Sequence, residues 1–259
     1  MLAKLVFARR WLATALSFAL FGLGGIIIPV MVLPLLFCLP GGKKNREVNA
    51  QQAIHFSFGK FIQLMRFMGV LTYEVHNLEE LKSAQLVLAN HPTLLDVVFL
   101  IALMPNANCV VKGTLLRNPF MRWPIKAAGY IFNNGNIDEV IAGVRHAFDK
   151  GQAMIVFPEG TRTIPSERLR LKRGAANIAI LAGVDITPVV IICEPASLTK
   201  QDKWYHIPDK PMHFEITVKP KILVNRFIDN IDRTKGSRAL TQQLTTYFNT
   251  EVKVNGSVT

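Results

Sequence analysis

The chain has 259 residues, half of them hydrophobic, and its 30 Lys and Arg outnumber its 18 Asp and Glu to give a formal net charge of +12. A mean hydropathy of +0.26 and a pI near 9.8 indicate contact with a membrane and an anionic partner. The basic residues are scattered and accompany no zinc-finger or aromatic RNA-binding pattern, so nucleic acid is excluded as the expected partner.

The three cysteines, Cys38, Cys109 and Cys193, are odd in number and each lies in an apolar stretch. This pattern argues against a disulfide framework and against a cysteine metal site, and it is typical of a reducing compartment.

An uncharged segment extends from Trp11 to Gly42 and exceeds the ~20 residues that cross a bilayer. A secretory signal peptide has a shorter apolar core and a small-residue cleavage site, so the segment predicts an uncleaved membrane anchor. Basic residues flank it on both sides, and the positive-inside rule therefore selects no orientation for a single crossing. These residues are Lys4, Arg9, Arg10, Lys43, Lys44 and Arg46.

Two topologies remain open for residues 11–42. A broken helix or hairpin would enter one leaflet and return, whereas a single span would place the rest of the chain outside the cytoplasm. Residues 50–70 follow with apolar side chains at helical spacing and predict an amphipathic helix. We therefore expect an anchoring domain over residues 1–70 and a globular domain over residues 71–259. The candidate break points are Gly22, Gly24, Gly25, Pro29 and Pro34.

After residue 72, short β-rich runs alternate with helical ones. This alternation predicts an α/β fold, with a mostly parallel sheet flanked by helices and preceded by the N-terminal membrane-embedded helical segment. Strands are expected at 84–89, 108–112, 130–132, 153–157, 186–193 and 213–218, and helices at 93–104, 118–129, 136–150, 172–183 and 237–252.

Residues 195–212 are polar and contain three prolines, which is typical of a long loop. Trp204 and Tyr205 within it would either rest at a membrane interface or pack on the domain.

Polar motifs follow two of the predicted strands, in "VLANHPTLLD" and "IVFPEGTR". Five residues on an ideal helix correspond to about 140° of rotation, so His91 and Asp96 would not share a helix face. They can meet if His91 precedes the helix and folds back over its first turn. Taken alone, the first motif is also typical of an ordinary helix start, with Pro92 in the first turn and Asp96 as a first-turn acid.

In the second motif, Gly160 supplies backbone freedom and Arg162 a planar fork suited to phosphate. As an isolated string, it is equally typical of a surface turn with a solvated arginine.

Four blocks in this order resemble the glycerolipid acyltransferase family: "NHPTLLD", "VKGTLLRNPF", "FPEGTR" and "ITPVVI" with Pro188. The resemblance covers roughly residues 70–225. It implies transfer of an acyl chain from acyl-carrier protein or acyl-CoA to the free hydroxyl of a lysophospholipid, by default lysophosphatidic acid to phosphatidic acid. No metal and no cofactor beyond the thioester co-substrate are implied.

The resemblance also implies roles for single residues. His91 would be the general base, and Asp96 would orient its ring. The second block lacks the family's aromatic-isoleucine-acid-arginine run, so Arg117 is its only arginine candidate. Residues expected to bind the acceptor are Lys112, Arg117, Glu159, Gly160, Thr161, Arg162 and Lys172.

The sequence also allows alternatives to this function. A membrane-anchored hydrolase lacks support because no G-x-S-x-G motif is present. A non-catalytic basic lipid-binding protein would need Arg162 but not His91 and Asp96. A different acceptor, such as lyso-ornithine lipid, remains an alternative. The basic flanks, the cysteines and the thioester donor together predict the cytoplasmic face of an inner membrane, with membrane phospholipids as partners.

Overall fold

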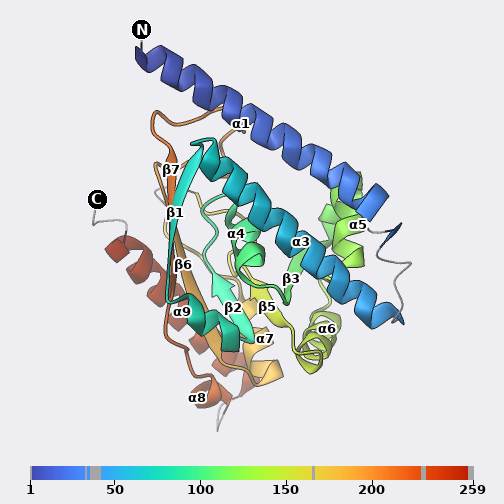
Figure 1. Cartoon of the computed structure of the whole chain (residues 1–259). Coiled ribbons are helices and arrows are strands. Elements are labelled where there is room, and N and C mark those ends of the chain that lie inside the picture. The colour runs from blue at the N-terminus through green and yellow to red at the C-terminus, as the bar shows by residue number, and fades with distance from the viewer. Residues whose placement is uncertain (1, 33, 36–41, 165–166, 229–231, 256–259) are drawn as a thin grey trace.

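The computed structural model describes residues 2–32, 34–35, 42–164, 167–228 and 232–255 (Figure 1). A seven-stranded sheet, in the order β1-β7-β6-β2-β5-β3-β4, forms its centre. Its strand pairs are parallel except for the antiparallel pair β6 and β7. The strands are β1 (Leu71–His76), β2 (Leu86–Ala89), β3 (Ala107–Lys112), β4 (Ile131–Asn133), β5 (Ala153–Val156), β6 (Ile186–Glu194) and β7 (Met212–Val218).

Helices cover both faces of this sheet, which confirms the predicted α/β fold. One face packs on α3, α4 and α5, and the other on α6, α7 and α9. The helices are α1 (Leu2–Ile27), α3 (Gly42–Phe67), α4 (Asp96–Leu103), α5 (Pro119–Ala127), α6 (Ile137–Asp149), α7 (Arg173–Ala182), α8 (Asn225–Ile228) and α9 (Arg233–Asn255), with a π-helical turn at Ile28–Val32 and 3-10 turns at Leu78–Ser83 and Gly113–Arg117.

The central strand β2 shows why its sequence is an unbroken apolar run. Leu86 and Leu88 face the core beneath α6, α7 and α9, whereas Val87 and Ala89 face the core beneath α3 and α4. Side chains alternate between the two faces of a strand, so a strand covered on both sides needs apolar residues at every position.

The N-terminal helix α1 runs along the outside of the molecule, antiparallel to α3 (Figure 1). It continues through Gly22, Gly24 and Gly25, so the predicted break at these glycines is wrong. The α-helix ends at Ile27, and Pro29 lies within the π-helical turn that follows. A glycine inside a helix costs only about 0.5–1 kcal/mol and does not by itself end the helix. Residues 36–41 of the predicted segment, with Cys38, lie outside the described residues.

The described residues include one helix, Lys4–Met31, that is long and apolar enough to cross a membrane, judged by length and composition. Its membrane topology stays a prediction.

Trp204 packs against Phe18 of α1 with ring centroids 5.9 Å apart and is still half exposed.

Helix α3 begins at Gly42, earlier than predicted, and its apolar face enters the core of the α/β domain through Ile54, Ile62 and Met65. Hydrogen bonds of buried side-chain amides attach this helix to the rest of the domain. The Gln51 side chain donates to the carbonyl of Ala128 at 2.8 Å and accepts from Gln152 at 3.1 Å. The helix is therefore part of the domain core and not only an anchor.

Two differences from the predicted elements concern the sheet and the first helix after it. Strand β1 was not predicted, because its partner β7 lies 141 residues further along the chain, as in the pair Leu71↔Met212. Helix α4 begins at Asp96 instead of residue 93, because residues 93–95 form a turn closed by the Asp96 carboxylate.

Replacing Gly236 with alanine tests the contact between α8 and α9. An added Cβ would overlap the backbone carbonyl oxygen of Phe227, so Gly236→Ala is expected to lower the free energy of unfolding by about 1–3 kcal/mol. Gly59→Ala, where a Cβ meets no atom within 4 Å, is the control and is expected to raise it by about 0.5–1 kcal/mol. Denaturant unfolding of both variants in detergent micelles measures the difference, and equal effects would contradict this packing.

Candidate active site

Three neighbouring parallel strands end in the predicted motifs. Strands β2, β5 and β3 lie side by side in the sheet. Residues 90–96 follow β2, residues 157–162 follow β5, and residues 113–117 follow β3. Because the carboxyl ends of parallel strands open at one edge of a sheet, the three blocks share that edge.

His91 precedes α4 and folds back over its first turn, which is the arrangement that allows it to meet Asp96. Its Nδ1 lies 2.8 Å from Oδ2 of Asp96, and its ring stacks on Phe157 with centroids 4.2 Å apart. If Nδ1 donates to the carboxylate, the lone pair of the neutral ring lies on Nε2, and this tautomer is assigned from the hydrogen bonds. The His91 side chain is 18% exposed, so the ring is not sealed from ligands.

Asp96 is fully buried at the first residue of α4. The Thr93 hydroxyl donates to its Oδ1 at 2.6 Å, and the Thr93 backbone N–H donates to its Oδ2 at 2.7 Å. Burial raises the pKa of this carboxyl, and the hydrogen bonds from His91 and Thr93 oppose that rise. The turn thus holds Asp96 in one orientation, with Oδ2 directed at the histidine ring.

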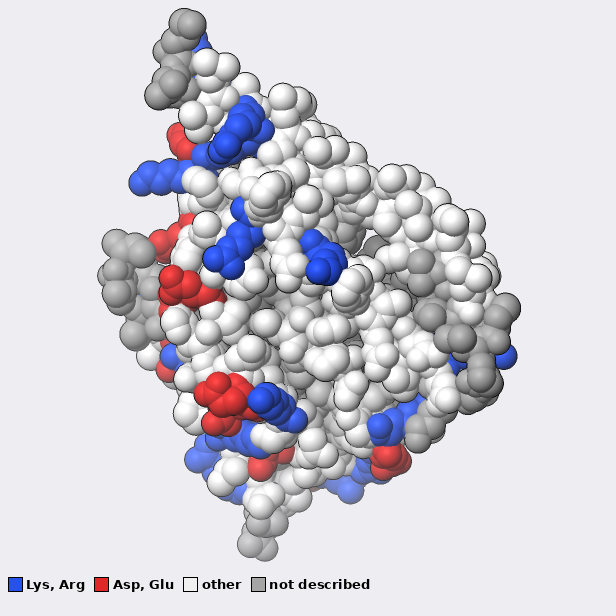
Figure 2. Space-filling model, in the orientation of Figure 1, with Lys and Arg blue, Asp and Glu red and all other residues white. Residues whose placement is uncertain are grey.

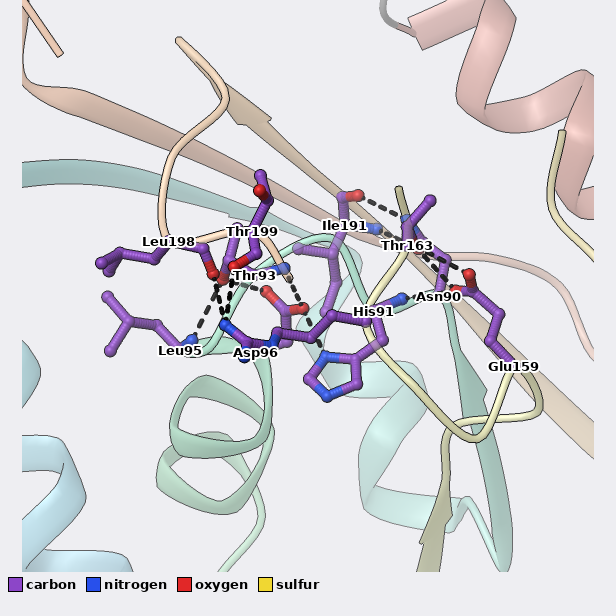
Figure 3. A network of polar contacts seen from close by, with 11 residues as sticks. Asn90, His91, Thr93, Leu95, Asp96, Glu159, Thr163, Ile191, Leu198 and Thr199 are labelled. Carbon is purple, nitrogen blue, oxygen red and sulfur yellow. Dashed lines mark hydrogen bonds and ion pairs between the residues drawn. The ribbon is translucent and has the colours of Figure 1, made fainter. Parts of the chain in front are cut away.

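Glu159 of the second motif connects the loop after β5 to the loop after β2, which carries His91 (Figure 3). Its Oε1 accepts the backbone N–H of His91 at 2.9 Å, and both carboxylate oxygens accept the Thr163 hydroxyl at 2.9 Å. The backbone N–H of Thr163 donates to the His91 carbonyl at 2.7 Å. His91 is therefore held through its side chain by Asp96 and through its backbone by the loop that follows β5.

Asn90 fixes the start of the histidine turn and was missed by the sequence reasoning. Its side-chain amide donates to the carbonyl of Ile191 and accepts from the N–H of Ile191, both at 2.7 Å. The amide thus extends the pairing of β2 with β6 by one step. An asparagine directly after a buried strand was the available signal.

Arg162 points to a third loop, the one between β6 and β7. Its Nη1 donates to the carbonyls of Leu198 at 3.0 Å and Thr199 at 2.8 Å. The Leu198 carbonyl also accepts from the N–H of Leu94 in the histidine turn, at 3.0 Å. The two N–H groups of Nη1 serve these carbonyls, and the guanidinium carries three further donors on Nη2 and Nε.

Gly160 and Lys172 lie against each other. Gly160 has a φ of +66°, which favours glycine, and a Cβ there would lie 3.0 Å from Nζ of Lys172. The backbone N–H of Lys172 donates to the carbonyl of Pro158 at 2.8 Å. This lysine, at the start of α7, therefore brings an exposed positive charge to the turn that carries Thr161 and Arg162.

Lys112 ends β3 and Arg117 ends the 3-10 turn after it, and both are exposed at the same edge of the sheet. Their predicted contacts with a ligand stay predictions. Within the described ranges, His, Cys, Asp and Glu form no group of three or more that could hold a metal ion.

A groove of about 1000 Å³ borders the histidine turn. Asn90, Pro92 and Thr93 line one side of it, and residues of β6, β7 and the C-terminal end of α9 line the other. Its lining contains the neighbours of His91 but not His91 itself.

The chain is similar to known proteins in sequence and in fold. Residues 72–192 match the family model described as Acyltransferase. The chain is 33% identical over 141 residues to 1-acyl-sn-glycerol-3-phosphate acyltransferase of Saccharomyces cerevisiae, covering 51% of this chain and 46% of that protein. It is 32% identical over 126 residues to the Helicobacter pylori protein of the same name, covering 45% of this chain and 53% of that one. The chain thus spans about half the length of these curated relatives.

A solved structure shares the fold. The 1-acyl-sn-glycerophosphate (LPA) acyltransferase PlsC from Thermotoga maritima superposes with a TM-score of 0.69 at 20% sequence identity, covering 94% of this chain and 98% of that chain. The similarity extends over the N-terminal helices as well as the sheet, because so little of either chain is left uncovered.

The partly buried carboxyl group of Glu159 predicts that the stability of the protein depends on pH. Burial raises the pKa of this carboxyl above its ordinary value of 4.5, so the folded state keeps a proton that the unfolded state has lost. The free energy of unfolding should therefore fall as pH rises from 4.5 through the folded-state pKa.

Glu159→Gln is expected to remove this slope, because glutamine does not titrate. The measurement is the difference in unfolding free energy between wild type and variant across that pH range. Glu79→Gln, at an exposed position, gives the baseline for removing one acidic group. A difference that grows in favour of the wild type as pH rises would contradict the argument.

Proposed function

We propose, on the premise that residues 72–192 match the family model described as Acyltransferase, that the protein transfers an acyl chain from a thioester to the free hydroxyl of a lysophospholipid. The observation that carries the proposal is the 2.8 Å contact between His91 Nδ1 and Asp96 Oδ2 at the mouth of the sheet. A lipid-binding module has no need of an oriented base, whereas a hydroxyl that must attack a thioester does.

In the proposed reaction, Nε2 of His91 removes the proton from the acceptor hydroxyl as its oxygen attacks the thioester carbonyl. Asp96 stabilises the imidazolium that forms, and the stacked Phe157 ring fixes the plane of the imidazole. The tetrahedral intermediate collapses by breaking the C–S bond, and the imidazolium returns the proton to the departing thiolate. The acyl group passes directly to the acceptor without an acyl-enzyme.

The proposed acceptor is lysophosphatidic acid, whose phosphate would be bound at the turn that follows β5. Arg162 and Lys172 supply positive charge there, and Gly160 and Thr161 present backbone between them. Lys112 and Arg117 would contribute from the neighbouring strand end. Glu159 would act differently, since a carboxylate repels a phosphate: it positions this turn by binding the His91 backbone.

The donor is proposed to be acyl-carrier protein or acyl-CoA, both acidic and suited to a chain of net charge +12. The protein is proposed to work at the cytoplasmic face of an inner membrane. In support, the surface over α1 in Figure 2 is almost free of charged residues beyond its first turns. Large apolar side chains are exposed along this helix at Leu5, Leu12, Leu16, Leu20, Leu23 and Ile26.

His91→Ala is expected to lower the rate of acyl transfer by ~10²–10⁴-fold, because the acceptor hydroxyl loses its base. Purified protein in mixed micelles would receive both donors with lysophosphatidic acid, lyso-ornithine lipid and other lysolipids, and mass spectrometry would detect the acylated product. His146→Ala, at an exposed position of α6, is the matched control and should retain full activity. Equal rates in the two variants would remove His91 from the mechanism.

Arg162→Ala is expected to raise the KM for lysophosphatidic acid by about 10–100-fold, since a charge-assisted hydrogen bond contributes about 1.5–3 kcal/mol. Its effect on an uncharged monoacylglycerol acceptor should be much smaller. Arg238→Ala, on the exposed face of α9, removes the same charge elsewhere and serves as control. An equal rise in KM for both acceptors would argue that Arg162 does not bind the phosphate.

A further inference from the structure

The loop between β6 and β7 contacts the site at one end and α1 at the other. Near its start, the carbonyls of Leu198 and Thr199 accept from Arg162. Near its end, the carbonyl of Asp209 accepts from Arg10 Nη1 at 2.6 Å, and the carbonyl of Pro208 accepts from Arg10 Nη2. One loop therefore joins the guanidinium of the candidate phosphate site to the guanidinium of the N-terminal helix.

Arg10 is an unusual residue for its position. It is 5% exposed, although α1 is otherwise mainly exposed and apolar. Burying an arginine is costly unless its charge is met by acceptors, and here two backbone carbonyls of the loop meet it. The side chain thus attaches the loop to the helix at a point where apolar contact alone would not fix its position.

Apolar contacts on the same face of α1 reinforce this attachment. Phe18 packs on Trp204 of the loop. A small cavity is lined jointly by Arg10 and Thr14 of α1 and by Leu198 and Trp204 of the loop. Leu198 is 3% exposed and has a φ of +54°, which a leucine adopts only when its surroundings hold it there. The residue whose carbonyl accepts from Arg162 therefore lines one small cavity together with Arg10 and Thr14 of α1.

We propose that Arg10 is a positioning residue for acyl transfer: by fixing the loop to α1, it places the Leu198 and Thr199 carbonyls that aim Arg162 at the anionic group of the acceptor. The inference rests on the proposed function and deepens it, because it assigns a part of acceptor recognition to the N-terminal helix. His91 and Asp96 are held by Thr93 and Glu159 instead, so the effect falls on acceptor binding more than on the chemical step.

The test compares Arg10→Met with Arg9→Met in the full-length protein. Arg9 neighbours Arg10 on α1 but is exposed, so both variants lose one positive charge from the helix and share any effect on the membrane surface. Arg10→Met is expected to raise the KM for lysophosphatidic acid about 10-fold, equivalent to about 1.4 kcal/mol, with kcat and the KM for monoacylglycerol within about twofold. Arg9→Met should leave all three near the wild-type values.

A double-mutant cycle separates positioning from general destabilisation. If Arg10 acts through Arg162, Arg10→Met should add little to the KM of Arg162→Ala, whereas independent effects would multiply. Trp204→Ala removes the other contact of the loop with α1 and should raise the same KM, which keeps the test open if Arg10→Met folds poorly. Multiplicative effects, or a KM for Arg10→Met equal to that of Arg9→Met, would overturn the inference.

A readout without turnover distinguishes this inference from the proposed function. Trypsin cleavage at Lys200 and Lys203 in the loop should be faster in Arg10→Met than in Arg9→Met, because a loop released from α1 opens more often. Absence of acyl transfer in the wild type would refute the proposed function, and the cleavage rates would still show whether Arg10 fixes the loop. Equal cleavage in the two variants would refute the attachment itself.

Discussion

The hydrogen bond between His91 and Asp96 depends on where α4 begins. Had the helix extended back to include His91, the two side chains would point to different faces of it, because five residues correspond to about 140° of rotation. The Thr93 hydroxyl and N–H instead donate hydrogen bonds to the Asp96 carboxylate. Residues 93–95 therefore form a turn, and the helix begins only at Asp96. His91 is left on the strand side of a tight turn, over the helix start, where its ring meets the carboxylate.

The same turn is the meeting point of three loops that are distant in sequence. Glu159 reaches it from the loop after β5, and Leu198 reaches it from the loop after β6. Each contact uses a backbone group of residues 91–94, so the surrounding loops hold the histidine turn in addition to its own contacts between Thr93 and Asp96. Buried carboxylates at such a junction cost solvation, and their hydrogen bonds offset part of that cost.

Local patterns were enough to predict every strand except β1, and the Asn136 cap of α6, which accepts from the N–H groups of Asp138 and Glu139. They failed where a distant partner decides the outcome. Glu159 carries the signature of a phosphate turn, yet its observed partner is a backbone N–H 68 residues away. The glycines of α1 do not end the helix, because a single glycine lowers helix stability by only about 0.5–1 kcal/mol. Nothing near Arg10 in the sequence indicates that its guanidinium donates hydrogen bonds to backbone carbonyls of a loop almost 200 residues later.

The placement of β1 has a consequence for how the chain folds during its synthesis. Its hydrogen-bonding partner β7 begins at Met212, so this edge of the sheet stays unpaired until about four-fifths of the protein has left the ribosome. Contacts of such sequence separation form slowly, and through that interval the apolar face of α3 has no completed sheet beneath it. Until then the apolar face of α3 is exposed to water and can aggregate with other chains. Insertion of α1 into a lipid surface while translation continues would cover that face.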